Sequence, residues 1–171
     1  EFMTAHRGTV TGHYETVIGD DNLFMAYSHV AHDCVVGSRC VFANSASLSG
    51  HVVVEDDVVL GGFVPVKQFL RIGRFAYVGG MTPVNKDVLP FTWTSSDRDT
   101  KAYKINGVGL SRKGYSADRV ASLQKAYRIL HRHRHDHAAA MAALGELAST
   151  APDVKVLFDF IQSSRAGVHG A

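Results

Sequence analysis

Residues 18–41 read IGDDNL, FMAYSH, VAHDCV and VGSRCV, and an apolar residue opens each of these groups of six. The same step continues to residue 89, so that twelve consecutive groups begin with an aliphatic or aromatic residue. Because 46% of the chain is apolar, an unbroken run of this kind has a chance of roughly one in ten thousand in a given register. The leading residues are Ile18, Phe24, Val30, Val36, Phe42, Leu48, Val54, Leu60, Val66, Ile72, Val78 and Val84.

A period of six belongs neither to an α-helix, which repeats about every 3.6 residues, nor to an ordinary strand, which repeats every two. A short strand followed by a tight corner, taken three times, gives a triangular coil of about eighteen residues with each leading residue pointing inward. The step therefore predicts a parallel β-helix, and it resembles the left-handed hexapeptide-repeat family. A sandwich of short strands, the alternative, would place turn signals about every 8 to 12 residues.

Two further positions of the group of six carry a pattern. The fifth position is mostly small or branched, as at Cys34 and Ala46, and we expect it to pack near a corner. Glycine often follows the leading residue, as at Gly37 and Gly61. We expect these glycines to relieve backbone strain at the bend.

The step is interrupted near the start of the chain. The segment AHRGTV fits one more group, led by Ala5, and the TGHYET that follows breaks the step. The register returns at Ile18 after one extra residue. This interruption predicts a loop that leaves the coil between the two groups.

The repeat divides the chain into three expected parts. Residues 1–90 form a left-handed β-helix domain, residues 91–115 an irregular connecting loop segment, and residues 116–171 a C-terminal helical domain. In the last part we expect three helices, the first beginning after an N-cap at Ser116 and the third carrying Pro152 in its first turn. These helices would cover the open end of the coil.

The composition is that of a soluble globular protein, with 20% charged residues and a formal charge of +2. No apolar run reaches the length of a membrane span, and no secretory leader opens the sequence. Cys34 and Cys40 are too few for a disulfide scaffold or a four-cysteine zinc site, which suits a reducing cytoplasm. The small net charge does not favour nucleic acid as a partner.

Residues eighteen apart should lie on the same face in adjacent coils, about 4.8 Å apart. Adding eighteen to His32 gives Gly50 and then Gln68, and adding eighteen to Asp33 gives His51. These residues are therefore expected to form one compact patch, with His29 a corner away.

This patch suits the removal of a proton from a hydroxyl group. Histidine is the usual general base near neutral pH, and a neighbouring carboxylate can orient it, as Asp33 would orient His32. Gly50 leaves a backbone N–H open as an oxyanion donor. Because no serine or cysteine is paired as a nucleophile, direct attack by a substrate hydroxyl is favoured. The alternatives are a solvated histidine surface, or a zinc site of His29, His32 and His51 across a subunit junction; we expect no metal.

Two segments make a specific match, HVAHDC at residues 29–34 and GLSRKGY at residues 109–115. With them the chain resembles the acyl-carrier-protein-dependent UDP-N-acetylglucosamine O-acyltransferases that open lipid A biosynthesis. The resemblance implies a cytoplasmic homotrimer with active sites between neighbouring β-helices. It implies transfer of a 3-hydroxyacyl chain from acyl carrier protein to the glucosamine 3-hydroxyl of UDP-N-acetylglucosamine, without a cofactor.

The resemblance also implies roles for single residues. His32 would be the general base, Asp33 its orienting partner and Gly50 the oxyanion donor. The expected substrate-binding residues are His29, His51, Lys67 and Gln68 in the sugar-nucleotide cleft, Asn106 and Arg112 at uridine and phosphate, and Gly80 beside the acyl groove.

Three features depart from the family pattern. Lys67 stands where the family usually has histidine, and Val108 stands where it commonly has an acid. The resemblance begins in the middle of the family's coil, so that roughly the first five coils would be missing, which suits either a fragment or a shortened paralogue. Lys67 and Val108 keep open a related enzyme with an amino-sugar acceptor, and the missing coils keep open a non-catalytic trimeric paralogue. A zinc lyase of the β-helix type is a third alternative.

The stretch HRHRHDH at residues 131–137 is expected to be a solvated junction between two helices, although alternate histidines can also bind a metal. Several basic residues could form a rim for the acidic acyl carrier protein, or an ordinary charged surface. They are Arg71, Arg74, Lys101, Arg112 and Lys113.

Overall fold

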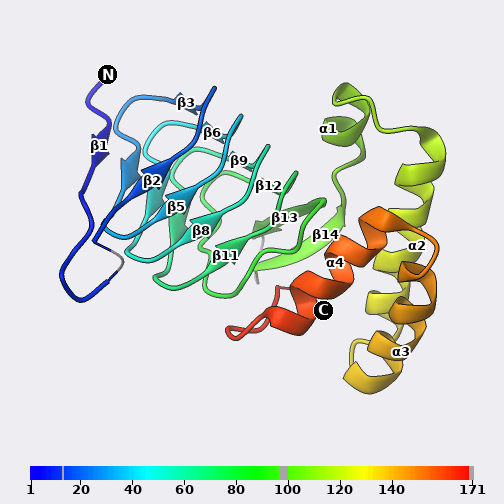
Figure 1. The fold of residues 1–171 in the computed structure, drawn as a ribbon. Coiled ribbons are helices and arrows are strands. Elements are labelled where there is room, and N and C mark those ends of the chain that lie inside the picture. Colours follow the sequence, from blue (N-terminus) through cyan, green and yellow to red (C-terminus); the bar gives the residue numbers. More distant parts are fainter. Residues whose placement is uncertain (13, 97–99, 170–171) are drawn as a thin grey trace.

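The computed structural model describes residues 1–12, 14–96 and 100–169 and shows a coil of short strands that is followed at one end by helices (Figure 1). Each strand of the coil is two residues long, as the combination of a short strand and a tight corner predicts. The strands are β1 (Thr4–Ala5), β2 (Val17–Ile18), β3 (Leu23–Phe24), β4 (His29–Val30), β5 (Val35–Val36), β6 (Val41–Phe42), β7 (Ser47–Leu48), β8 (Val53–Val54), β9 (Val59–Leu60), β10 (Pro65–Val66), β11 (Arg71–Ile72) and β12 (Tyr77–Val78).

The strands stack into three parallel sheets, one for each side of the triangle. Sheet A contains β1, β4, β7 and β10, sheet B contains β2, β5, β8 and β11, and sheet C contains β3, β6, β9 and β12. Val30 lies opposite Leu48 in sheet A, a step of eighteen residues. Ala5 lies opposite Val30, which confirms the extra group before the loop. The predicted parallel β-helix is therefore confirmed.

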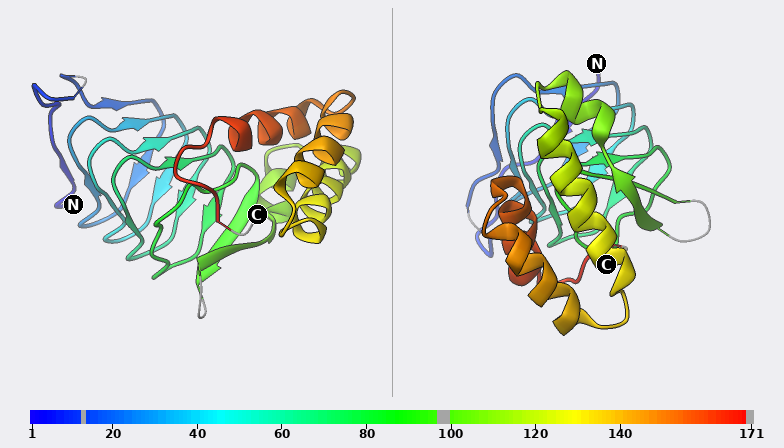
Figure 2. Two further views of the ribbon diagram at one scale, coloured as in Figure 1. Left: turned by 90° about the horizontal axis from the view of Figure 1, so that it is seen from below. Right: turned by 90° about the vertical axis from the view of Figure 1, so that its right-hand side faces the viewer.

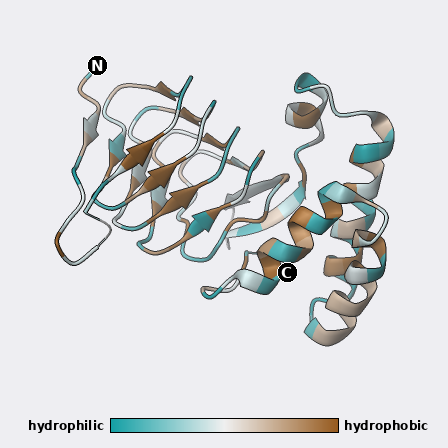
Figure 3. Ribbon diagram, viewed as in Figure 1, coloured by the Kyte–Doolittle hydropathy of each residue, from teal (hydrophilic) through white to brown (hydrophobic). Residues whose placement is uncertain are grey.

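The interior of the coil is filled by the two positions that the repeat singled out. Leading residues such as Leu48 and fifth residues such as Val52 are at most 3% exposed through the middle of the coil. Figure 3 shows most strands of sheet B as hydrophobic. Both cysteines are free and lie in this interior. The hydrophobic effect thus fixes the register, because a shift would expose a whole column of apolar side chains.

The corners turn at residues that are not glycine. The fourth residue adopts a positive φ in every group from the one led by Ile18 to the one led by Val78, for example 59° at Asp33 and 61° at His51. The glycines that follow the leading residues have another role: a Cβ at Gly37 would overlap Asp56, and one at Gly61 would overlap Gly80 in the next coil. The expectation that these glycines relieve strain at the bend was wrong, because they are needed for close approach between coils.

Residues 91–115, expected to be irregular, are largely ordered into regular elements. Strand β13 (Thr92–Ser96) runs parallel to β12, and β14 (Thr100–Ile105) pairs with it in antiparallel fashion, so that both extend sheet C. The short helix α1 (Gly107–Arg112) follows. The sequence concealed β13 because its buried positions are the polar residues Thr92 and Thr94, at 1% and 0% exposure.

The three helices expected at the end of the chain are present as α2 (Ala117–Arg132), α3 (His137–Ala148) and α4 (Pro152–Ser163). Ser116 caps α2 through its side chain, and Pro152 is the first residue of α4, both as predicted. Figure 2 shows the helices gathered beyond the last coil. Among the residues described, no helix is both long and apolar enough to cross a membrane.

The chain returns to the coil after α4. This C-terminal tail, residues 164–169, lies along the last coil (Figure 2). Ser164 Oγ donates to Asp87 Oδ2 over 2.8 Å, and Val168 forms a bridge with Asp87. The imidazole of His169, 3% exposed, accepts backbone N–H groups of Asn85 and Lys86 at Nε2, over 3.3 and 3.1 Å, and Nδ1 donates to the Thr100 carbonyl.

These contacts predict a dependence of stability on pH. Burial is the main cause that lowers the pKa of His169 below the ordinary 6.5, and the charge of Lys86 adds to it, whereas the Thr100 hydrogen bond and Asp87 oppose it. Because the pKa is lower in the folded state, the stabilisation is complete above pH 6.5 and is lost as the pH falls below that value. We expect the free energy of unfolding of the wild-type chain to fall more between about pH 7.5 and about pH 5.5 than that of His169→Gln, measured by urea denaturation. Equal falls in the two chains would contradict this role.

Candidate active site

The candidate site lies at the corner between sheets A and B, which we call the A/B corner: residues 31–34, 49–52, 67–70 and 85–88 of successive coils. His32 and Asp33 turn this corner between β4 and β5. In the next coil, the His51 backbone N–H donates to the His32 carbonyl over 3.0 Å. The repeat therefore places Gly50 next to His32 and His51 next to Asp33, as the step of eighteen predicted.

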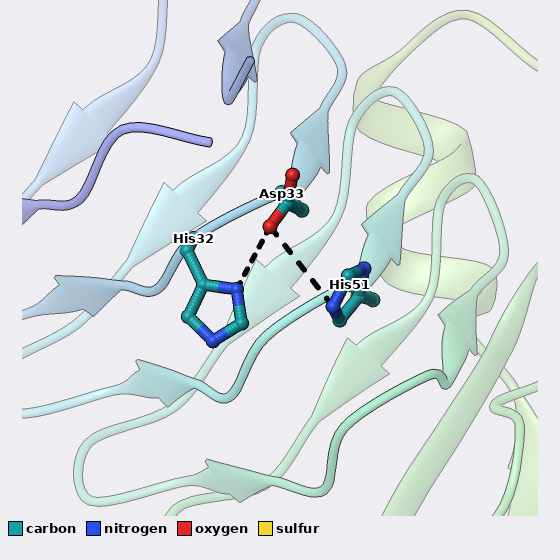
Figure 4. A group of neighbouring side chains, drawn as sticks. All are labelled: His32, Asp33 and His51. Carbon is teal, nitrogen blue, oxygen red and sulfur yellow. Dashed lines mark hydrogen bonds and ion pairs between the residues drawn. The ribbon is translucent and has the colours of Figure 1, made fainter. Parts of the chain in front are cut away.

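His32 and Asp33 form a hydrogen-bonded pair (Figure 4). His32 Nδ1 lies 2.9 Å from Asp33 Oδ2, and the side chain of His32 is 42% exposed while that of Asp33 is fully buried. A carboxylate only accepts hydrogen bonds, so the proton of the neutral imidazole is assigned to Nδ1. Nε2 is then left as an acceptor on a ring that substrate can reach, which is the state a general base requires.

Gly50 packs against the His32 ring. A Cβ at position 50 would lie 2.5 Å from His32 Cε1 and 2.8 Å from Nε2, so only glycine allows this approach. The residue is buried, and its backbone N–H donates to no acceptor among residues 1–12, 14–96 and 100–169. Gly62 holds the same position in its own group, at the corner between sheets C and A, and its N–H is also unpaired among the described residues. An open N–H at this position is therefore not particular to Gly50. The imidazole ring beside it is particular to Gly50.

His51 adds a second imidazole to the corner. Its Nε2 lies 4.0 Å from Asp33 Oδ2, its ring meets that of His32 edge-on with centroids 5.2 Å apart, and it stacks on Phe69 at 4.6 Å. Ligand atoms of His32, Asp33 and His51 all lie within 4.8 Å of one another, which is close enough for a metal ion. The Asp33 oxygen that would bind such an ion already faces His32 Nδ1, and it accepts a hydrogen bond from Thr9 Oγ1 over 2.7 Å. A proton-transfer pair therefore fits these contacts better than a metal centre.

The loop between β1 and β2 folds over Asp33. Thr9 donates its backbone N–H to both carboxylate oxygens, over 3.1 and 3.2 Å, and its hydroxyl to one of them. The Asp33 backbone N–H donates to Thr16 Oγ1 over 2.9 Å, and a Cβ at Gly12 would overlap the carboxylate. Sequence reasoning missed Thr9, because the interrupted step predicted the loop but not where it returns.

We expect Thr9→Val to lower kcat about tenfold while the KM of both substrates stays within about twofold, because a lost hydrogen bond to a buried charge costs about 1–3 kcal/mol. Thr9→Ser restores the hydroxyl and should restore most of the rate. Steady-state kinetics on both variants measure this. A rise in KM without a change in kcat would show that Thr9 contacts substrate instead of positioning Asp33.

The remaining residues expected near the base are partly brought together. Lys67 and Gln68 lie exposed on the A/B corner, one coil beyond Gly50. His29 lies on β4, where its Nδ1 is 2.8 Å from Thr4 Oγ1 and its ring meets that of His6 edge-on. Burial, and then the charge of His6, lower the pKa of His29. In the structure Asp33, rather than His29, completes the cluster with His32 and His51.

The other expected binding residues lie away from the A/B corner, at the two remaining corners of the triangle. They are Asn106, Arg112 and Gly80. Asn106 is the N-cap of α1, where its Oδ1 accepts from Gly109 N and its Nδ2 donates to the Phe75 carbonyl, at the corner between sheets B and C. Arg112 is exposed at the end of this helix. Gly80 is exposed at the corner between sheets C and A. Within one chain, these residues are not brought to His32.

An ion-pair network holds α1 against its corner. Lys113 Nζ lies 2.6 Å from Asp57 Oδ1, and Arg39 Nη2 lies 3.0 Å from Asp57 Oδ2. Burial alone would raise the pKa of Asp57, but the hydrogen bonds and charges of Arg39 and Lys113 outweigh it and lower the pKa. Lys113, expected in a basic rim, is therefore engaged with the coil, and this contact places Arg112 beside it.

The coil of six-residue repeats defines the class of the protein, a hexapeptide-repeat protein, and its corner carries an imidazole–carboxylate pair. Residues 15–50 match the model of the bacterial transferase hexapeptide, described as six repeats. Residues 87–169 match the model of the second domain of UDP N-acetylglucosamine O-acyltransferase. The chain belongs to the UDP-N-acetylglucosamine O-acyltransferase family.

Relatives and solved structures agree with this assignment. The acyl-(acyl-carrier-protein)–UDP-N-acetylglucosamine O-acyltransferase of Xylella fastidiosa is 44% identical over 165 residues, 96% of this chain and 63% of the relative. The UDP-N-acetylglucosamine acyltransferase structure of Francisella novicida is 30% identical, with a TM-score of 0.95 over 100% of this chain and 62% of its own. That of Campylobacter jejuni is also 30% identical, with a TM-score of 0.86 over 99% and 69%. The chain thus spans less than two thirds of the curated relative's length.

Proposed function

We propose that this protein transfers a 3-hydroxyacyl chain from acyl carrier protein to the glucosamine 3-hydroxyl of UDP-N-acetylglucosamine, the first step of lipid A biosynthesis. The observation that carries the proposal is the half-exposed His32 imidazole, held by buried Asp33 and packed against the open N–H of Gly50. The names of the relatives supply the donor and the acceptor.

The arrangement supports a direct transfer. His32 Nε2 takes the proton of the sugar hydroxyl as its oxygen attacks the thioester carbonyl, and Asp33 stabilises the imidazolium through Nδ1. The carbonyl oxygen becomes an oxyanion that accepts a hydrogen bond from Gly50 N–H. When the tetrahedral intermediate collapses, the C–S bond breaks, the thiolate of the carrier leaves, and His32 returns the proton to sulfur.

We further propose that the active protein is a homotrimer whose sites lie between neighbouring coils. The support is the position of the expected binding residues on three corners of one triangle: His51 and Gln68 on the first, Asn106 and Arg112 on the second, and Gly80 on the third. Three coils side by side would place the second corner of one chain against the first corner of the next. In this arrangement Arg112 offers its planar guanidinium to a phosphate group.

The proposal is tested by a transfer assay with a panel of acyl carrier protein thioesters and UDP-N-acetylglucosamine, with and without prior dialysis against a chelator. We expect transfer that needs both substrates and survives dialysis. Loss of transfer on dialysis, restored by zinc, would instead favour the zinc lyase type of site. Binding of neither substrate by a well-folded protein would establish a non-catalytic paralogue.

A different acceptor is the second candidate, and two side chains favour it. Lys67 lies exposed on the A/B corner where the family usually has histidine, and Val108 is 64% exposed on α1 where an acid is common. Lysine in place of histidine adds a positive charge, and valine in place of an acid removes a negative one, so an acceptor would meet a different charge at both positions. Comparison of hydroxyl and amine acceptors with one acyl donor separates the two functions.

We propose a cytoplasmic location, without nucleic acid as a partner and without a cofactor. The two buried free cysteines suit a reducing compartment, and a nucleotide sugar and an acyl carrier protein are both cytoplasmic substrates. The formal charge of +2 gives no electrostatic reason for binding nucleic acid.

A further inference from the structure

A pocket lies beside the candidate base at the A/B corner. It has a volume of about 440 Å³ and is lined by His51, Phe69, Arg165 and Ala166. This volume lies in the range of about 300–1,000 Å³ that is typical of small-molecule sites. Two of the lining residues come from the coil and two from the C-terminal tail, which sequence reasoning did not connect with the site.

The tail is held firmly where it borders this pocket. The Asp87 backbone N–H donates to the Gly167 carbonyl over 2.9 Å, and the His169 N–H donates to the Asp87 carbonyl over 3.0 Å. Asp87 is itself 2% exposed, and its Oδ1 accepts the Arg71 backbone N–H over 2.8 Å. Arg165 is therefore anchored on both sides, by Ser164 before it and by residues 167–169 after it.

The guanidinium of Arg165 is available for a ligand. Arg165 is exposed, and it forms no ion pair or side-chain hydrogen bond with any residue in the described ranges 1–12, 14–96 and 100–169. Its neighbours in the pocket are an imidazole, a phenyl ring and a methyl group, so the pocket lining contains no carboxylate. A pocket with a cation, an imidazole ring and an apolar wall favours an organic anion.

We propose that Arg165 forms, with His51 and Phe69, a subsite for a phosphate group of a substrate. The inference rests on the proposed function, because both proposed substrates carry phosphate: the diphosphate of the nucleotide sugar and the phosphodiester of the carrier's prosthetic arm. His51 lies 5.2 Å from His32 between ring centroids, so one side of this pocket borders the candidate base. The guanidinium fork matches two phosphate oxygens at once.

The test compares Arg165→Gln and Arg165→Lys with Arg132→Gln, an exposed arginine at the end of α2, in the protein that carries this chain. Calorimetry gives the Kd of UDP-N-acetylglucosamine and, separately, of holo acyl carrier protein, without need of transfer. We expect Arg165→Gln to raise one of these Kd values about tenfold or more, with a smaller rise for Arg165→Lys and none for Arg132→Gln. The substrate whose Kd rises identifies the source of the phosphate.

Unchanged Kd values for both substrates in Arg165→Gln would overturn the proposal. Because binding is measured directly, that result differs from a failure of the proposed function, in which wild-type protein binds but transfers nothing. A double-mutant cycle tests the anchor: if His169→Gln acts by moving Arg165, its effect on the same Kd disappears in the Arg165→Gln background.

Discussion

His32→Ala should abolish nearly all transfer while the protein stays folded. A general base contributes about 10²- to 10⁴-fold, so we expect kcat/KM for UDP-N-acetylglucosamine to fall by that factor. The fold should survive because the ring is 42% exposed and Asp33 keeps its hydrogen bonds from Thr9. We expect the free energy of unfolding to change by less than about 1 kcal/mol.

The matched control is His131→Ala, which removes an exposed histidine at the end of α2. Both variants are compared by initial rates of transfer and by urea denaturation. If His32→Ala retains a rate within severalfold of the wild type, His32 is not the base. The direct mechanism would then need another proton acceptor.

Gly50→Ala is expected to cost almost as much activity through a single methyl group. The added Cβ would lie 2.5 Å from His32 Cε1 and 3.1 Å from Nδ1, so the ring must move away. Movement breaks the 2.9 Å hydrogen bond to Asp33 and takes the base away from the oxyanion donor. Because these groups act together, we expect kcat to fall by about 10²-fold or more.

Gly62→Ala is the matched control, since Gly62 occupies the same position in its own group of six. Among the described residues, a Cβ there would meet only the Asn44 carbonyl oxygen, at an ordinary 3.4 Å. Neither glycine has a positive φ, so alanine introduces no backbone strain in either case. Gly50→Ala with full activity would mean that the base does not work from its observed position.

The sequence by itself determined the coil and the first half of the site. A constant step of six residues means that every coil repeats the same geometry. Once the register of one group is known, the position of every later residue in the repeat follows from it. Hence a step of eighteen residues predicted that Gly50 lies beside His32 and that His51 lies beside Asp33. Handedness and substrates came from resemblance, not from the step.

Only the tertiary structure decided which parts outside the repeat return to this corner. The loop that carries Thr9 and the tail that carries Arg165 are placed by contacts with Asp33 and Asp87, and neither segment has a period from which its path could be read. Strand β13 was hidden for a related reason, since threonines fill its buried positions. Local geometry propagates along a repeat, whereas a loop or tail is fixed by single long-range hydrogen bonds whose partners the sequence does not name.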